Sequence, residues 1–285
     1  MRAGEESSAA VSVRGHELSA TGVTVAYDGV DVVHGASVTL LPGEVTVLVG
    51  PNGSGKSTLL RTLARLHRPR TATLVIDGTD GLALTAREFS RRVALLTQGR
   101  PTPSGLTVRD VVEFGRYPYR GRWGTADPDG RAAVDRALAM TGVADLAERG
   151  AERLSGGQLQ RVWLASCLAQ ETGVLLLDEP TTYLDLRYQI ELLDLVRDLA
   201  DDHGIAVGAV LHDLDQAAAL ADRIVLLHEG RIVADGLPDD VLTAERLTDI
   251  YGIRIEVGTD PLTGRLRTRA IGRHHTRSER LITPS

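Results

Sequence analysis

The sequence is poor in cysteine and lysine. Cys167 is the only cysteine of the 285 residues, which excludes an internal disulfide and fits a reducing compartment. It lies in an apolar, helix-like stretch, where a small core residue is more common than a reactive thiol. Lys56 is the only lysine among 32 Lys and Arg residues. A chain that uses arginine everywhere else suggests a special need for a compact ammonium group at that position.

Long hydrophobic runs are missing as well. No apolar run approaches the ~20 residues needed to cross a bilayer, and Met1–Ala10 is acidic and Ser-rich, unlike a secretory signal. We therefore expect no membrane span in the chain, which leaves a membrane partner open. The net charge of −6 argues against a nucleic-acid binder, because phosphate backbones require a basic face.

Short apolar segments alternate with helical patterns along most of the chain. Strand–helix alternation indicates a mostly parallel sheet covered on both faces, and the earlier alternating runs indicate antiparallel strands. We expect a flexible leader over residues 1–15, a single folded unit over 16–272 and a polar tail over 273–285, with a helical insertion over about 90–162. The predicted strands are Thr21–Tyr27, Ala36–Leu40, Val45–Val49, Leu74–Ile76, Val174–Leu177, Ile205–Leu211 and Ile224–Leu227.

A glycine-rich motif follows the predicted strand Val45–Val49. Residues 50–57 read GPNGSGKS and fit the phosphate-binding pattern GxxxxGK[ST], placed between a strand and a helix as that pattern requires. Backbone N–H groups of such a loop surround phosphate oxygens, and the positive end of the next helix adds to them. We expect Lys56 to contact the β- and γ-phosphates and Ser57 to bind Mg²⁺. The predicted phosphate-binding residues are Asn52, Gly53, Ser54, Gly55, Lys56, Ser57 and Thr58.

Two acids end the predicted strand Val174–Leu177. Ligand-binding groups of a parallel sheet gather at the carboxyl ends of its strands, beside the phosphate loop. We expect Asp178 to hold Mg²⁺ and Glu179 to act as general base toward the attacking water. The alternative interpretation is a helix N-cap with an acidic first turn, which the sequence Asp-Glu-Pro also suits.

A third motif, Leu154-Ser155-Gly156-Gly157-Gln158, precedes another predicted helix. A Ser hydroxyl and Gly N–H groups at a helix start suit a phosphate, although Ser-Gly alone is a common turn. Together, the three motifs resemble the ATP-binding cassettes of ABC transporters over about Glu17–Arg273. The resemblance implies an α/β fold, with a P-loop NTPase core, an antiparallel β subdomain and an inserted helical subdomain. ATP and Mg²⁺ are the implied cofactors.

The resemblance assigns further residues one at a time. Tyr27 corresponds to the aromatic that stacks on adenine, Gln98 to the glutamine that senses the γ-phosphate and Mg²⁺, and His212 to the histidine that contacts the γ-phosphate. Asp185 corresponds to the aspartate that crosses the dimer interface. The alternative to each role is a purely structural one: a half-buried strand tyrosine, a surface glutamine and a structural strand-end histidine. The turn Pro69–Ala72 departs from the family, which usually has a glycine there.

The resemblance also implies partners. Two cassettes of the family pack head to tail, so that ATP held by Lys56 of one is completed by Ser155, Gly157 and Gln158 of the other. The implied partners are a second copy of the chain, integral membrane permease subunits and, indirectly, a substrate-binding protein, with no nucleic acid. The expected location is the cytoplasmic face of the cell membrane, as a peripheral subunit.

Three segments resemble the ATPases of ferric-siderophore importers, namely Gly115–Arg120, Thr181–Asp185 and Leu211–Ala217. Haem and cobalamin importers have similar subunits, so these cargoes stay open. The basic, aromatic stretch Gly115–Trp123 is either a permease contact or a solvated loop, and His274-His275 is either a metal ligand pair or an unremarkable part of the tail.

Two other classes of protein share the cassette. Soluble cassettes act in iron–sulfur assembly, translation or DNA repair, but these usually carry two phosphate loops, long coiled-coil heptads or a changed Ser-Gly-Gly-Gln motif. Exporter ATPases are commonly fused to a membrane domain. The sequence shows one phosphate loop, no long heptad pattern and no apolar run of the length of a membrane span. The importer subunit is therefore the favoured interpretation.

Overall fold

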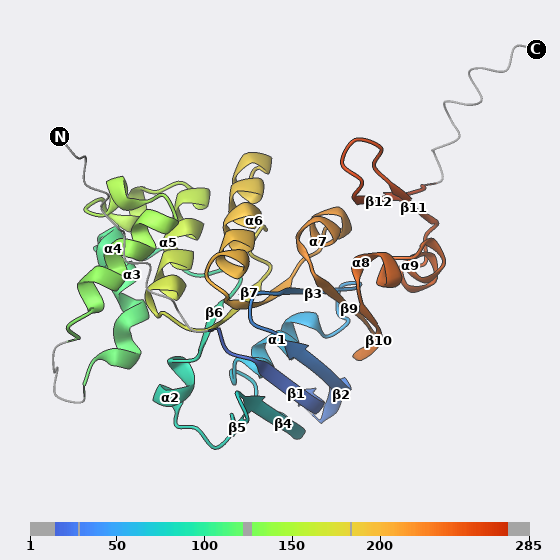
Figure 1. Cartoon of the computed structure of the whole chain (residues 1–285), viewed down its shortest axis with the longest axis horizontal. Helices are drawn as coiled ribbons and strands as arrows, with labels where there is room; N and C mark the ends of the chain where they lie inside the picture. Colours follow the sequence, from blue (N-terminus) through green and yellow to red (C-terminus); the bar gives the residue numbers. More distant parts are fainter. Residues whose placement is uncertain (1–14, 28, 122–126, 183, 273–285) are drawn as a thin grey trace, which may run out of the picture.

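The computed structural model describes residues 15–27, 29–121, 127–182 and 184–272. Two sheets enclose helix α1 (Lys56–Leu63), and a layer of helices stands beside them (Figure 1). Helix α1 contacts β1 and β2 of one sheet and β7 and β8 of the other. It therefore lies in the middle of the molecule, with its first residues directly behind the glycine-rich loop.

The central sheet confirms the predicted parallel core. Its six strands lie in the order β10-β9-β3-β8-β7-β6, and all neighbours are parallel except β9 and β10. Every residue of β3, β7 and β8 is buried, as in strands covered on both faces. The strands are β3 (Val45–Val49), β6 (Val93–Leu96), β7 (Val174–Asp178), β8 (Ala206–Val210), β9 (Arg223–His228) and β10 (Arg231–Gly236).

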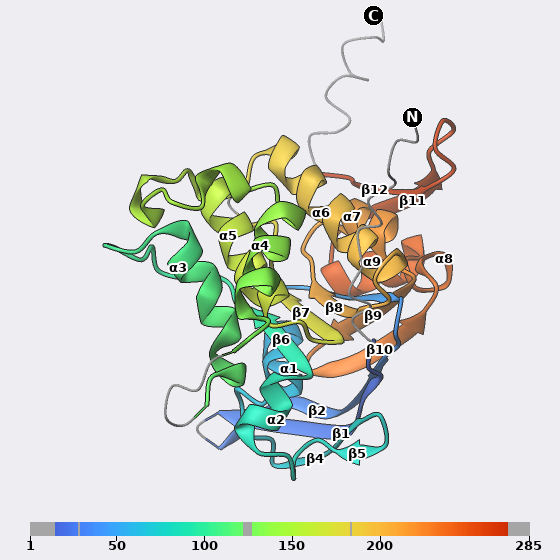
Figure 2. The same cartoon turned by 60° about the vertical axis from the view of Figure 1, so that its left-hand side comes forward.

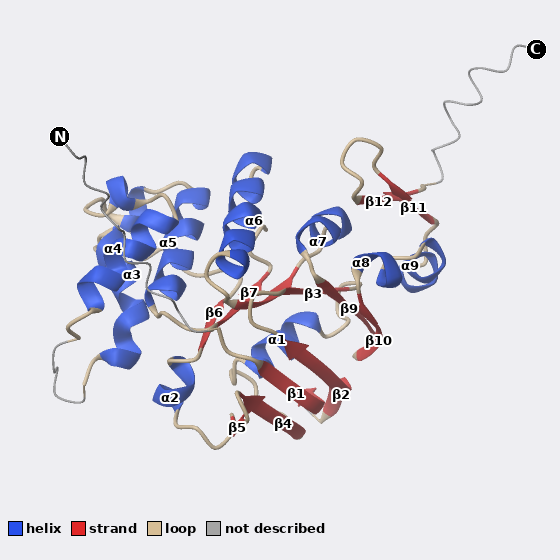
Figure 3. Ribbon diagram, viewed as in Figure 1, coloured by secondary structure: helices blue, strands red, loops and turns tan. Residues whose placement is uncertain are grey.

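Side-chain alternation along β3 divides the core into two halves. Val45, Val47 and Val49 pack into a cluster shared with α6 and α7. Leu48 points the other way, into a cluster with Leu59 of α1 and the antiparallel sheet. Helices α6 (Leu186–Asp201) and α7 (Leu214–Leu220) thus cover one face of the central sheet, and α1 covers the other (Figure 3).

The antiparallel sheet has the order β2-β1-β4-β5. The half-exposed strands expected there are present and longer than predicted, because β-bulges let both strands continue through Gly22 and Gly35. The turn before β4 needs no glycine, because residues 66–72 all have negative φ and the left-handed residue is Arg65. The strands are β1 (Leu18–Tyr27), β2 (Val30–Leu40), β4 (Thr71–Ile76) and β5 (Thr79–Asp80).

The helical layer stands beside the two sheets (Figure 2). It has an apolar core of its own, in which Val111, Leu138 and Val162 are buried together. Its extent differs from the predicted range of about 90–162. Strand β6 lies inside that range but pairs with β7 in the central sheet, and α5 runs beyond residue 162. The helices of this layer are α3 (Val108–Glu113), η1 (Phe114–Tyr119), α4 (Gly130–Met140), η2 (Ala144–Leu146), η3 (Ala151–Arg153) and α5 (Gly156–Ala169). Helix α2 (Ala86–Ser90) lies outside it, and its Phe89 is buried in the cluster of the antiparallel sheet.

The C-terminal part forms elements that the sequence patterns did not indicate. A hairpin of β11 and β12 packs on α7, where the backbone N–H and hydroxyl of Thr268 both donate to Asp215 Oδ1, at 2.7 and 2.8 Å. The predicted leader and tail, including His274-His275, fall almost entirely outside the described residues. The elements are α8 (Pro238–Val241), α9 (Ala244–Tyr251), β11 (Ile255–Thr259) and β12 (Leu266–Ala270).

Candidate functional site

The strand order explains why distant motifs meet. Strands β3, β8, β7 and β6 are neighbours and run in the same direction, so the segments that follow them emerge side by side. These segments carry the phosphate loop after β3, His212 after β8, Glu179 after β7 and Gln98 after β6. Four parts of the chain, spread over more than half its length, therefore converge on one edge of the sheet.

The glycine-rich loop is held by close backbone packing. Gly50 has φ 143°, and a Cβ atom there would lie 2.0 Å from the carbonyl oxygen of Leu227, so only glycine fits. Gly55 has φ 98° and stands at the N-cap of α1, with no side-chain cap and no acid in the first turn. The first N–H groups of α1 thus lack the usual side-chain partner, which leaves them available to an anion.

Lys56 is buried against its own loop. Its Nζ donates to the carbonyl oxygens of Gly50 and Pro51, each at 2.8 Å, and the residue is only 5% exposed. Burial lowers the pKa of the ammonium group, while the charges of Glu179 and Asp178 act in the opposite direction. A desolvated ammonium beside two carboxylates is a strong local charge, in position to meet phosphate oxygens.

A pocket of about 160 Å³ connects these groups. It brings together most of the predicted phosphate-binding residues with the predicted base and the histidine. Val32 of β2, which the motifs did not indicate, contributes to its wall. The lining residues are Val32, Asn52, Gly53, Gly55, Lys56, Ser57, Thr58, Glu179 and His212.

One carboxylate oxygen of Asp178 has no hydrogen-bond partner among the described residues. Asp178 is 1% exposed, and its Oδ2 accepts from Arg61 Nε and lies near Arg61 Nη2, both at 2.7 Å. Its Oδ1 is buried and has no partner within the described residues. An unpartnered, buried carboxylate oxygen fits Mg²⁺, which takes one or two carboxylates and completes its shell with phosphates and water. Arg61 is a residue that motif reading missed, since one Arg on a helix is too common a signal.

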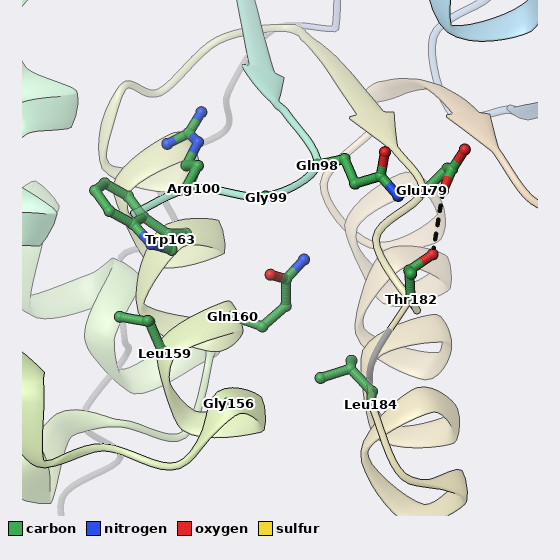
Figure 4. Close-up of a pocket in the computed structure, with 10 residues that line it drawn as sticks. All are labelled: Gln98, Gly99, Arg100, Gly156, Leu159, Gln160, Trp163, Glu179, Thr182 and Leu184. Atoms are coloured by element: carbon green, nitrogen blue, oxygen red, sulfur yellow. Dashed lines mark hydrogen bonds between the residues drawn. The ribbon is translucent and has the colours of Figure 1, made fainter. Parts of the chain in front are cut away.

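Glu179 has an unusual backbone and several polar partners. Its φ of 53° is left-handed, a conformation that costs free energy in a non-glycine residue and often marks a functional site. Glu179 Oε2 accepts from Gln98 Nε2 at 2.5 Å and from Thr182 Oγ1 at 3.3 Å, while Oε1 lies 2.5 Å from His212 Nε2. Figure 4 shows Gln98 and Thr182 directed toward the carboxylate. The structure thus unites three predicted residues and adds Thr182.

The Ser155 motif lies outside this pocket. Ser155 caps α5, since its hydroxyl accepts from Gln158 N at 3.3 Å while Gln158 Oε1 accepts from Ser155 N at 3.0 Å. Gly157 packs against Tyr188, where a Cβ atom would come within 2.9 Å of the ring. Asp185 caps α6 in the same manner. Ser155 and Asp185 are exposed, so both remain accessible to another molecule.

Tyr27 also lies apart from the pocket lining. It is 43% exposed at the end of β1, and its ring packs edge-on against His67 with centroids 5.3 Å apart. The exposed face of the ring has room for a planar group. The described contacts of Tyr27 do not include the phosphate loop, so its contact with adenine stays a prediction.

The fold and the phosphate loop place the chain among the P-loop nucleoside-triphosphate hydrolases. A family model described as ABC transporter matches residues 33–182, and the chain belongs to that family. It is an ABC transporter ATPase, as the resemblance implied.

Curated relatives align along most of the chain. The ferric enterobactin transport ATP-binding protein of Escherichia coli (strain K12) is 43% identical over 255 residues, covering 88% of this chain and 91% of the relative. A siderophore transport ATP-binding protein of Bacillus subtilis (strain 168), described as probable, is 41% identical, with 87% and 90% covered. A cobalamin import ATP-binding protein of Halobacterium salinarum is 46% identical, covering 87% of this chain and 62% of the relative.

Solved structures agree on the cassette fold. A dimeric bacterial ABC transporter cassette superposes with a TM-score of 0.68 at 27% identity, covering 78% of this chain and 98% of that one. An inward-facing structure, described as of a metal-chelate type ABC transporter, gives a TM-score of 0.79 at 26% identity, with 91% and 99% covered.

Proposed function

We propose that the chain is the ATPase subunit of an ABC importer for a ferric siderophore or a similar iron chelate. The carrying observation is the similarity to siderophore-transport ATP-binding proteins at 41–43% identity over almost their whole length. The pocket between the phosphate loop and Glu179 supports the chemical half of this function, because its groups suit a nucleoside triphosphate and no other recognisable cargo.

The nucleotide is held by charge and by backbone donors. Lys56 leaves the carbonyls of Gly50 and Pro51 and binds the β- and γ-phosphates, and the N–H groups at the start of α1 add further donors. Ser57, Asp178 and Gln98 would hold Mg²⁺, which would supply positive charge to neutralise the charge that develops on the phosphates. Tyr27 supplies the aromatic surface for adenine.

Hydrolysis depends on Glu179. The carboxylate accepts a proton from the attacking water as general base. His212 and Gln98, which contact the two carboxylate oxygens, fix its orientation and contact the γ-phosphate region. A carboxylate held by several donors needs little reorganisation as the water attacks.

Two copies of the chain complete each site. Ser155, Gly157 and Gln158 lie outside the pocket that holds Lys56, and the exposure of Ser155 and Asp185 lets them face a second cassette. ATP closes the dimer because it binds the closed state preferentially, and hydrolysis releases it.

The dimer acts on integral membrane permease subunits, served by a substrate-binding protein, from the cytoplasmic face of the membrane. No helix in the described parts of the chain is long and apolar enough to cross a bilayer. Cargo therefore passes through partner subunits. No nucleic acid takes part.

Cobalamin import is the second candidate, favoured by the 46% identity to the Halobacterium salinarum protein, and haem import is a third. A soluble, non-transport cassette has less support.

The test is uptake in a strain that lacks this gene and has no substitute ATPase. Radiolabelled ferric siderophore should no longer enter, while capture by the binding protein continues. A plasmid copy of the wild-type gene should restore uptake, and a Glu179→Gln copy should not. Normal iron-chelate uptake in the deletion strain, with loss of cobalamin or haem uptake, would transfer the function to that cargo.

A further inference from the structure

The segment that follows Glu179 is held through its backbone by one glutamine side chain. Gln189, in the first turn of α6 after its cap, donates through Nε2 to the carbonyl oxygen of Leu184 at 2.9 Å and to that of Thr181 at 3.4 Å. Between these two carbonyls lies Thr182, whose hydroxyl contacts Glu179. The position of Thr182 therefore depends on the amide of Gln189.

The other end of this amide is bound from a different helix. Gln189 Oε1 accepts from Gln216 Nε2 at 2.8 Å. Gln216 belongs to the first turn of α7, four residues after His212. The amide of Gln189 thus links the segment that carries Thr182 to the helix that begins behind His212.

Helix α7 is itself fixed on its far side. Asp213 caps its start by accepting from the N–H groups of Asp215 and Gln216, and Asp215 is bound to Thr268 of the C-terminal hairpin. Gln216 therefore donates to Gln189 from a helix that is anchored to the C-terminal hairpin. The carbonyl segment that Gln189 holds does not have the same support on its opposite side.

A cleft of about 170 Å³ borders that opposite side. Figure 4 shows Thr182 and Leu184 on one wall and Gly156 and Gln160 of α5 on the other. Two side-chain hydrogen bonds are described across it, from Gln160 Nε2 to the carbonyl oxygen of Pro180 at 3.0 Å and from Gln98 Nε2 to Glu179 Oε2 at 2.5 Å. On the α6 side, the bonds from Gln189 hold the carbonyl groups of Thr181 and Leu184.

We propose that Gln189 and Gln216 are positioning residues for ATP hydrolysis. Together they keep Thr182 and His212, two of the groups that contact Glu179, at a fixed separation. The geometry needs an amide at both places, because Gln189 must accept from one helix and donate to the loop at the same time. The Oε1 atom of Gln216 is buried and has no hydrogen-bond partner among the described residues. The bond from its Nε2 to Gln189 is therefore the hydrogen bond that explains the position of this side chain.

The variants Gln216→Met and Gln189→Met test the pair in the full-length chain. Each should lower kcat for ATP hydrolysis about fivefold or more, the rate equivalent of one neutral hydrogen bond. The KM for MgATP should stay within about twofold, because neither residue contacts the phosphate loop. The double variant should be no slower than Gln189→Met alone, since the two residues act as one unit.

Two further variants separate positioning from folding. Gln189→Glu keeps the shape and the acceptor for Gln216 but loses the donor to the loop, so it should also lower kcat, with a near-normal melting temperature. Gln170→Met is the matched control, because it removes an amide bonded to the carbonyl of Val93, on the other side of the molecule, and should leave kcat unchanged.

The inference rests on Glu179 as general base, so Glu179→Gln is measured in parallel. Loss of hydrolysis in Glu179→Gln, together with a normal kcat in Gln189→Met, Gln189→Glu and Gln216→Met, would overturn the positioning role. That result would leave the proposed function intact. Parallel losses of kcat and nucleotide affinity, or strictly additive effects in the double variant, would also overturn it. A normal rate in Glu179→Gln would contradict the general base itself.

Discussion

At the scale of single residues, Lys56 illustrates how burial and function combine. Its ammonium group is desolvated and bonded to two carbonyls of its own loop, so it is held at the mouth of the pocket with little freedom to lose on binding. An arginine in its place could not make the same compact contacts, because its planar fork is larger and its charge more spread. This agrees with the choice of lysine at one position in an arginine-rich chain.

We predict that Lys56→Ala loses ATP hydrolysis by at least about a hundredfold, because the β- and γ-phosphates lose an ammonium group in a site of low dielectric. Lys56→Arg should restore little of it. Arg68→Ala, which changes an exposed charge after α1, is the control and should retain the rate. Steady-state phosphate release measures all three, and activity near wild type in Lys56→Ala would contradict the assigned pocket.

The second prediction for a single residue concerns Glu179. Glu179→Gln should still bind MgATP but hydrolyse it at least about a hundredfold more slowly, because the amide cannot accept the proton of water. The ATP-bound dimer should then accumulate, and light scattering with MgATP should report twice the monomer mass. A variant that stays monomeric and hydrolyses ATP normally would remove Glu179 from the role of base.

At the scale of elements, an ion-pair cluster joins η1 to the segment before α4 and to the end of α5. Arg116 of η1 is 3% exposed and donates to both oxygens of Asp127, at 2.7 and 3.0 Å. It also donates to Glu171 at 2.7 Å and to the carbonyl of Ala169 at 2.9 Å, and its guanidinium lies 3.9 Å from the ring centroid of Tyr119. The segment that resembles siderophore-type ATPases is thus built around a buried cation.

We predict that Arg116→Met lowers the free energy of unfolding by about 3 kcal/mol at pH 7, because it leaves the partly buried Asp127 without its cation and leaves Glu171 with Arg136 alone. Arg120→Met, which removes an exposed pair with Glu113, should change it by less than about 1 kcal/mol. Urea denaturation followed by circular dichroism measures both variants.

The loss in Arg116→Met should depend on pH. The hydrogen bond from Arg116 holds the pKa of Asp127 below its usual value, so the folded state gains stability above the unfolded pKa of about 4 and loses it as the pH falls through the folded pKa. The difference between wild type and variant should therefore shrink below about pH 4. A difference that stays constant down to pH 2.5 would show that packing, not the ion pair, carries the effect.

At the scale of the whole molecule, the proposed importer places ATP hydrolysis in this chain and cargo recognition in its partner subunits. The pocket of the phosphate loop is small and polar, and the described residues contain no cluster of three or more His, Cys, Asp or Glu side chains suited to a metal ion. We predict that the isolated chain binds MgATP and shows no heat of binding with a ferric siderophore in titration calorimetry. Saturable siderophore binding to the isolated chain would contradict the division of labour in the proposed importer.

The nucleotide site could be predicted because its parts are contiguous motifs. Residues 50–57 specify a loop whose glycine conformations and helix start follow from local sterics, and Asp178 and Glu179 directly follow an apolar run. Strand β6 and the C-terminal hairpin were harder to predict. Both are short, and three of the five residues of each hairpin strand are exposed, so their patterns are weak and strand pairing decides them.

The sequence by itself determined which residues are the candidates for phosphate chemistry, because those residue types at that spacing act through their own backbone and side chains. Only the tertiary structure decided what surrounds them. Arg61 pairs with Asp178, and Gln216 meets Gln189 across two helices. Such contacts join residues far apart in the chain, and they depend on strand order and helix packing, which arise from the whole hydrophobic core and leave no local pattern.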